Sequence, residues 1–332
     1  MTSTPILNLP ATSPDLARRL SDGLDRVNAL LAARVDNEDP FIAAASAHLL
    51  PGGKRLRPLL ALRASELGPD GINDRVVAAA AAVELTHLAS LYHDDVMDDS
   101  DVRHGRPTAH AAYDNSTAIL VGDLLFGTAS DIVADLGPEA VRIQAQTFVR
   151  LCSGQIRDDR PCPPGQDPVD YYLGVLRDKT GVLIATAARY GGMFGGCSAD
   201  VVGMLREYGE RLGMAFQLAD DLLDVVSDAT QSGKTPGTDL REGKATLPVL
   251  FVRASTDPAD ERLKKLLASD LHDDAELREA LTLLRAHPAM TRARVETRAV
   301  GARAAEVLAP LPASDAKAAL LGLIGSVVER TV

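Results

Sequence analysis

Residues 75–99 read RVVAAAAAVELTHLASLYHDDVMDD, and this stretch is typical of one long helix. Its apolar side chains recur three and four positions apart, and the alternation of a half-buried β-strand is absent. The same periodicity runs through most of the chain, and prolines stand near the proposed helix ends, where they disturb a helix least. This periodicity predicts an all-α protein. No internal repeat and no long polar linker divides the chain, so we also predict a single domain, residues 1–332. The expected helices cover residues 14–35, 55–67, 73–98, 115–136, 138–158, 168–194, 198–228, 244–256, 273–286, 289–309 and 314–330.

Composition narrows the possible functions. The 332 residues are 46% hydrophobic, enough for a large core, and the formal net charge of -11 disfavours nucleic acid as a partner. We find no apolar run of about 20 residues and no signal-peptide pattern at the N-terminus, so we expect a cytoplasmic protein without a transmembrane segment. The three cysteines lack the paired spacing of a zinc site or a disulfide framework.

An acidic cluster ends the first long helix. Asp94 and Asp98 are four residues apart, which places both carboxylates on one helix face, and Asp95 lies beside them. Like charges so close repel each other unless a cation lies between them, and hard oxygen ligands suit Mg²⁺ that bridges to a substrate phosphate. For this cluster alone, a solvated acidic helix end is an equally good interpretation.

A second cluster has the same spacing. Asp220, Asp221 and Asp224 lie in AFQLADDLLD, residues 215–224, within another strongly apolar helix. A solvated acidic face needs no flanking Leu, Ala and Phe, whereas carboxylates that face a cavity between packed helices do. The pair of clusters therefore favours a metal site.

Three predicted loops combine Gly or Pro with cations, and such segments can surround an anion. The loop at 51–58, PGGKRLRP, offers Lys54, Arg55 and Arg57 beside a Gly-Gly turn. The loops at 98–108 and 232–244 follow the two Asp clusters, and the second of these is long enough to act as a lid. Cationic loops near carboxylate clusters indicate a phosphate-bearing substrate.

Further cations stand close to the clusters in sequence. Lys179 precedes Thr180 in an otherwise apolar helix, so we expect it to have an anionic partner. Lys234 and Lys244 flank the loop after the second cluster, although a lone lysine is more often simply exposed. His87 lies two turns before Asp94 on the same face, which favours a donor to a second anion over a structural role.

In order and spacing, these motifs resemble the trans-isoprenyl diphosphate synthase family, also called polyprenyl synthases. The resemblance covers most of the chain and rests on GGKRLRP, ELTHLASLYHDDVMD, VRHGRPT, VGD at 121–123, SGQ at 153–155, KT at 179–180, FQLADDLLD and GKTPGTDLREGKATLP. It implies a helical bundle around a central cavity, a homodimer, and Mg²⁺-dependent condensation of isopentenyl diphosphate with an allylic diphosphate, with three ions per active site.

The resemblance also implies a role for each matching residue. Asp94, Asp98 and Asp220 would hold the metal on the allylic diphosphate, supported by Asp95, Asp221 and Asp224. Arg103, Lys179, Lys234 and Lys244 would bind that diphosphate, Lys54, Arg57 and His87 would bind isopentenyl diphosphate, Phe216 would contact its hydrocarbon, and Gln217 and Thr180 would lie near the reacting carbon.

One position departs from the family pattern. The family usually has two arginines where this chain has Arg103 and His104, and the second normally contacts isopentenyl diphosphate. Histidine carries charge only when protonated, so binding there should be weaker and dependent on pH. We expect His104→Arg to lower the KM for isopentenyl diphosphate and to flatten its pH dependence in steady-state assays. An unchanged pH profile would place His104 outside the anion site.

Small side chains upstream of the first cluster predict a long product. Ala89 and Ser90 are too small to close a tunnel along this helix, so we expect a hexaprenyl to decaprenyl chain, such as quinone side chains need. The alternative is that Phe126 on the next helix forms an earlier floor, which would give geranylgeranyl diphosphate.

Other classes fit the sequence less well. A class I terpene cyclase usually lacks a second DDxxD cluster, and a phosphohydrolase of the HD type would need further His and Asp ligands that the sequence does not show. A noncatalytic subunit of a heteromeric prenyl synthase would be expected to lose Asp or Lys residues that are all present here.

Overall fold

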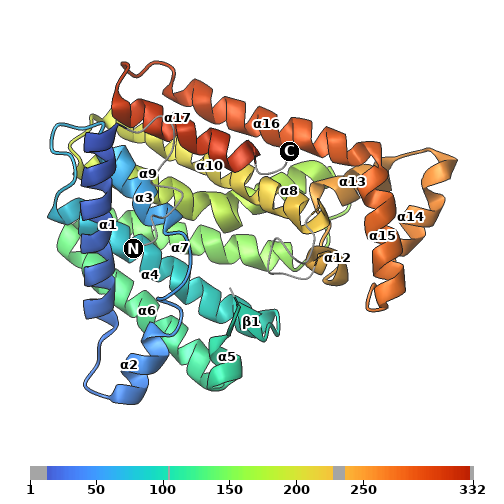
Figure 1. The fold of residues 1–332 in the computed structure, drawn as a ribbon, viewed down its shortest axis with the longest axis horizontal. Coiled ribbons are helices and arrows are strands. Elements are labelled where there is room, and N and C mark those ends of the chain that lie inside the picture. Colours follow the sequence, from blue (N-terminus) through green and yellow to red (C-terminus); the bar gives the residue numbers. More distant parts are fainter. Residues whose placement is uncertain (1–12, 104, 227–235, 330–332) are drawn as a thin grey trace. The chain divides into compact units, whose positions relative to one another are not determined.

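Helix α4, Asp74–Met97, is the central helix of the first of two compact units. Asn73 caps its start, where the side-chain oxygen accepts hydrogen bonds from the backbone N–H groups of Arg75 and Val76, at 3.0 and 3.1 Å. The helix contacts α1 (Pro14–Val35), α3 (Leu56–Ser65), α6 (Asn115–Leu136) and α9 (Val182–Phe194), as Figure 1 shows. Most of its residues are apolar and most are buried, because neighbouring helices pack around it.

Small residues allow these helices to pack closely. A Cβ atom at Gly191 on α9 would lie 2.1 Å from the carbonyl oxygen of Ala61 on α3, so only glycine fits there. The first unit also includes α2 (Pro40–Ala47), β1 (Val102–Arg103), β2 (Arg106–Pro107) and α5 (Ala109–Ala112). It comprises the described residues of Met1–Val149, Val182–Glu210 and Val307–Leu323.

The second unit contains the described residues of Arg150–Gly181, Arg211–Glu306 and Ile324–Val332. The helices α7 (Pro138–Asp158), α10 (Ala199–Val226), α16 (Pro288–Leu308) and α17 (Asp315–Val328) each contribute residues to both units. The remaining elements are α8 (Pro168–Leu176), the π-helix η1 (Arg177–Gly181), α12 (Thr238–Arg241), α13 (Leu247–Ala254), the 3₁₀-helix η2 (Pro258–Asp260), α14 (Glu261–Leu266) and α15 (Asp274–Ala286).

The computed structural model describes residues 13–103, 105–226 and 236–329. Within them the all-α prediction is confirmed, and α1, α6 and α7 have the predicted bounds. The helix predicted over 168–194 is interrupted by η1, and the predictions missed α2, the β1–β2 hairpin and the short helices α5, α12 and α14. These elements are too short for helical periodicity to identify them.

Two described helices are long and apolar enough to cross a membrane by length and composition alone. In α4, 72% of the apolar 18-residue window is buried inside the protein, and in α6 the share is 39%. A buried core helix passes the same test, so this is weak evidence for a membrane span. The absence of a transmembrane segment stays a prediction.

Candidate active site

The first Asp cluster lies at the C-terminal end of α4. Asp95 is fully buried, and its Oδ1 accepts a hydrogen bond from Arg103 Nε at 2.7 Å. Its Oδ2 is buried without a hydrogen-bond partner among the described residues. Burial raises the pKa of the Asp95 carboxyl, and Arg103 acts in the opposite direction. Asp94 is half-buried and Asp98 is exposed, so the helix turns Asp95 into the protein and the other two carboxylates away from it.

The β1–β2 hairpin positions Arg103. Val102–Arg103 pairs antiparallel with Arg106–Pro107, and Arg103 stands directly opposite Arg106. Residues paired in this way point to the same face of a hairpin. The hairpin therefore presents two guanidinium groups together, one of which bonds to the first Asp cluster.

The first unit contains a pocket of about 510 Å³, including its open mouth. His87 and Arg103, both predicted from the sequence, line it, together with His48 and Arg106, which the sequence analysis did not single out. Its full lining is His48, Leu49, Pro51, Gly52, Gly53, Arg55, Glu84, His87, Leu88, Leu91, Arg103, Arg106 and Pro107.

The cationic residues of the Gly-Gly turn at 51–58 differ in their contacts and burial. Arg55 has a positive φ of 51° and donates to Gly52 O at 3.0 Å and to Glu84 Oε1 at 2.9 Å. Arg55 therefore fixes the turn and neutralises Glu84 on α4. Arg57 is half-buried, its Nε has no hydrogen-bond partner among the described residues, and burial lowers its pKa. Lys54 is exposed.

In the second cluster, Asp221 is the buried member. Its Oδ1 accepts from Gln217 Nε2 at 2.9 Å, and its Oδ2 accepts from the Tyr172 hydroxyl. Gln217 in turn accepts from Thr180 Oγ1 at 3.1 Å, so the two residues predicted near the reacting carbon are bonded to each other. Burial raises the pKa of Asp221 to about 6, although both hydrogen bonds lower it. Nothing in the sequence indicated that Tyr172 belongs to this site, because it lies 49 residues before Asp221 in the chain.

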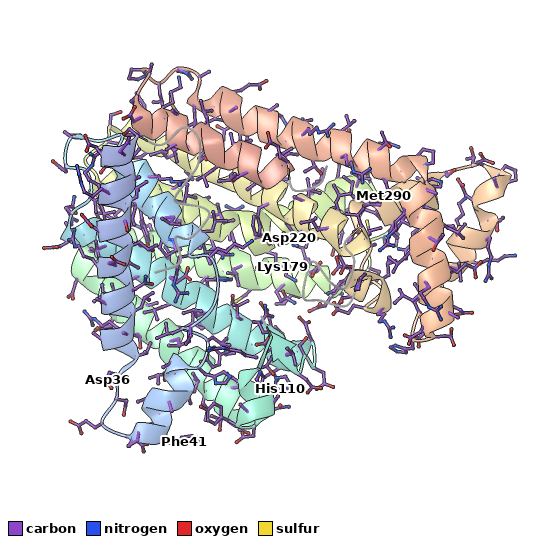
Figure 2. All side chains as sticks on the ribbon, in the orientation of Figure 1. Asp36, Phe41, His110, Lys179, Asp220 and Met290 are labelled. Atoms are coloured by element: carbon purple, nitrogen blue, oxygen red, sulfur yellow. The ribbon has the colours of Figure 1, made fainter. Side chains whose placement is uncertain are left out.

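The other members of the second cluster differ in their surroundings. Asp220 is half-buried on α10 and is labelled in Figure 2. Asp224 accepts backbone N–H bonds from Thr238 at 3.3 Å and Asp239 at 3.1 Å. Asp224 therefore holds the start of α12, and with it the end of the predicted lid loop.

The predicted anionic partner of Lys179 is Asp158 at the end of α7. Lys179 Nζ donates to Asp158 Oδ2 at 2.6 Å, and Lys244 Nζ lies 3.3 Å from the same oxygen and 3.1 Å from Asp159 Oδ1. Burial raises the pKa of Asp158, but the two lysines outweigh it and the pKa falls below its ordinary value. Asp158 was missed, although it stands three residues after the SGQ motif.

The residues proposed to set product length lie around the first cluster. Ala89 is fully buried in α4, and Ser90 is half-buried with its hydroxyl bonded to His87 O at 2.8 Å. On α6, the Phe126 ring lies 4.3 Å from Phe148 and 5.7 Å from His93, between ring centroids. Phe126 is therefore next to the residue that precedes Asp94.

Two predicted site residues, His104 and Lys234, lie outside the described residues. Within the described ranges, no group of three or more His, Cys, Asp or Glu side chains gathers closely enough to hold a metal ion. The carboxylates of each cluster would thus share a metal with other ligands, as Mg²⁺ does when it retains water and binds substrate phosphates.

An all-α chain with two DDxxD clusters and lysines held on carboxylates defines a class of enzyme that acts on diphosphates. Residues 39–284 match the family model of the polyprenyl synthetases. Nonaprenyl diphosphate synthase of Mycobacterium tuberculosis is 45% identical over 309 residues, 93% of this chain and 92% of that protein. The chain therefore belongs to the polyprenyl synthetase family, and it is a prenyltransferase.

Solved structures agree with this assignment. Geranylgeranyl pyrophosphate synthase from Corynebacterium glutamicum, complexed with calcium and isoprenyl diphosphate, matches with a TM-score of 0.86 and 39% identity, covering 96% of this chain and 98% of that one. A decaprenyl diphosphate synthase from Rhodobacter capsulatus matches with a TM-score of 0.86 and 36% identity, covering 96% and 99%. Both comparisons confirm the isoprenoid synthase type of fold that the resemblance implied.

Proposed function

We propose that this enzyme condenses isopentenyl diphosphate with an allylic diphosphate to give a long-chain all-trans polyprenyl diphosphate. The observation that carries the proposal is the second Asp cluster and its surroundings. Asp221 is joined through Gln217 to Thr180, and the adjacent Lys179 is held on Asp158. One hydrogen-bonded region thus contains carboxylates for a metal, lysines for a diphosphate and a hydroxyl near the reacting carbon.

The donor set fits a divalent cation. All the candidate ligands are carboxylates, and the buried Oδ2 of Asp95 has no protein hydrogen bond among the described residues. We propose Mg²⁺, three ions per active site, held by Asp94 and Asp98 on α4 and by Asp220 on α10. When bound, Mg²⁺ supplies positive charge to the diphosphate as it departs.

The chain's own residues perform the remaining work. Lys179 and Lys244 bind oxygens of the allylic diphosphate, which stabilises the charge that grows as its C–O bond breaks. Thr180 and Gln217 orient oxygen dipoles toward the positive allylic carbon. The pocket beside His87 holds isopentenyl diphosphate, whose alkene forms the new C–C bond, and the released pyrophosphate takes the proton that is lost. Packed apolar helices keep water away from the allylic carbocation.

A long product is favoured by the nonaprenyl and decaprenyl synthases among the similar proteins, together with the small side chains at Ala89 and Ser90. The geranylgeranyl synthase from Corynebacterium supports the shorter alternative, in which Phe126 forms the floor. The side chain that limits product length can therefore be sought by mutation at two places, Ala89 and Ser90 on α4 and Phe126 on α6.

We further propose a cytoplasmic homodimer. The face of α6 exposes Ile119, Leu120 and Leu124, and α7, which contacts α6 through Phe126 and Phe148, exposes Val149. Large exposed apolar groups gathered on neighbouring helices are typical of a protein interface. A second copy of the chain would cover them.

The direct test is to incubate the purified protein with Mg²⁺, isopentenyl diphosphate and, in turn, geranyl, farnesyl or geranylgeranyl diphosphate, and to measure product mass. We expect products of about six to ten isoprene units. Omission of Mg²⁺ is the control. A folded protein that makes no product with any primer would contradict the proposal, and activity that appears only with a second protein would support the subunit alternative.

Asp221 predicts that Mg²⁺ stabilises the protein in a pH-dependent way. A carboxyl whose pKa is raised to about 6 on folding destabilises the metal-free protein increasingly as pH rises from about 4 to about 6. A bound cation favours the ionised form and offsets this loss. The rise in Tm caused by Mg²⁺ and inorganic pyrophosphate should thus be larger at about pH 7.5 than at about pH 5.

Calorimetry with and without Mg²⁺ checks this prediction. Asp221→Asn is the matched control, because it removes the titrating group while keeping the side-chain shape. Equal shifts at both pH values in the wild-type protein would show that Asp221 does not contribute.

A further inference from the structure

The π-helix η1, Arg177–Gly181, interrupts what the sequence presents as a single helix. It contains both Lys179 and Thr180. A π-helix is rare, and single π-helical turns inside α-helices are frequent at functional sites. Something in the surrounding structure must therefore stabilise η1.

One such contact is the backbone of α7. A Cβ atom at Gly154 would lie 2.4 Å from Lys179 N and 2.8 Å from Lys179 Cα. Only glycine permits this approach, so α7 packs directly on the backbone of η1 at the lysine. This contact limits where η1 can move but does not by itself fix its register.

The second contact is an ion-pair cluster on the residue before the lysine. Asp178 Oδ1 accepts from Arg150 Nε at 2.9 Å and Arg150 Nη2 at 2.6 Å, and Asp178 Oδ2 pairs with Arg157 Nη2. The Asp178 side chain is only 15% exposed. Arg150 and Arg157 are seven residues apart and so lie on one face of α7. Charge-assisted bonds of this kind fix geometry as well as add energy.

Arg157 is itself held in place. Its Nε donates to Ser153 O at 3.3 Å, and its carbonyl oxygen accepts from the Tyr171 hydroxyl at 2.9 Å. Arg157 therefore gives Asp178 a partner that is itself held in place. We call the group Arg150, Asp178 and Arg157 the arginine clamp.

We propose that Asp178 is a positioning residue, and that the arginine clamp keeps η1 in the π register that presents Lys179 and Thr180 to the allylic diphosphate. This inference rests on the proposed function. If the clamp is lost and η1 relaxes to a regular α-helix, the register shifts by one residue and the side chains rotate by about 100°. Lys179 would then leave Asp158, and Thr180 would leave Gln217.

The test compares Asp178→Asn, which removes the charge, with Asp178→Glu, which keeps it. Glu279→Gln is the matched control, since Glu279 pairs with Arg262 in the same unit and its side chain is 41% exposed. We expect Asp178→Asn to raise the KM for farnesyl diphosphate and to lower kcat, each about tenfold or more, with the KM for isopentenyl diphosphate changed less than about twofold. Asp178→Glu should recover part of both, and Glu279→Gln should match the wild type.

A structural role alone would give a different result, in which kcat falls with the folded fraction and neither KM changes. That result, or wild-type kinetics in Asp178→Asn, would overturn the proposal. Hydrogen exchange of the amides at residues 177–181 gives a readout that does not depend on turnover, and it should be faster in Asp178→Asn than in Glu279→Gln. If the wild-type enzyme makes no product, the proposed function fails while hydrogen exchange still tests the clamp.

Discussion

Replacing Asp94 by alanine is expected to lower turnover by at least about a thousandfold, and replacing Asp220 should have an effect of the same size. Each change removes a proposed ligand of the cation that stabilises the departing diphosphate. Neither change should unfold the protein, because Asp94 and Asp220 are only half-buried and each stands among other carboxylates. Loss of a like charge relieves repulsion in the metal-free protein.

Turnover and circular dichroism should be measured on the same samples. Asp74→Ala at the start of α4 and Asp200→Ala at the start of α10 are matched controls, since both are exposed aspartates on the same helices. We expect the controls to retain wild-type turnover. Near-normal turnover in Asp94→Ala or Asp220→Ala would rule out the two-cluster metal proposal.

Replacing Ala89 by phenylalanine is expected to shorten the product by several isoprene units. Ala89 is fully buried, five residues before Asp94 on α4. Each helical turn advances about 5.4 Å, close to the length of one isoprene unit, so a bulky side chain here would stop the growing chain soon after the metal site. Product mass after incubation with farnesyl diphosphate is the measurement.

Two further variants separate the candidate floors. Ser90→Phe should also shorten the product, and it is easier to accommodate because Ser90 is half-buried. Phe126→Ala should leave the product unchanged if the chain runs along α4, but lengthen it if Phe126 is the floor. Longer products in Phe126→Ala, combined with no change in Ala89→Phe, would establish the geranylgeranyl alternative. Circular dichroism controls for overpacking at Ala89, which can destabilise a core.

The helices α6 and α7 were predictable because local signals mark their ends. Asp114 caps α6 by accepting from Thr117 N at 2.8 Å, and Pro138 begins α7. The π-helix was not predictable, because RDKTG has nothing in its own sequence that separates it from the helix around it. Its register depends on Gly154 and on the arginines of α7, which lie more than 20 residues earlier in the chain.

The same distinction holds for the candidate site. Helical spacing alone puts Asp94 and Asp98 on one face and Asp95 on another, and the fold buries Asp95. The partners of these groups come from elsewhere in the chain: Arg55 reaches Glu84, and Lys179 reaches Asp158. The cationic turn by itself offered Arg55 and Arg57 equally as ligands, and only the resemblance favoured Arg57. Only the fold shows that Arg55 stabilises the turn.

The carboxylate of Asp158 affects which anions can bind to Lys179 and Lys244. Because its pKa is held below the ordinary value, Asp158 stays ionised at neutral pH and already neutralises much of the charge of Lys179 and Lys244. An incoming anion must compete with this internal counter-ion for both lysines. A singly charged phosphate or chloride gains little from that exchange, whereas the diphosphate group carries more negative charge than the one carboxylate that it displaces. The enzyme would thus discriminate against simple, singly charged anions in favour of a diphosphate.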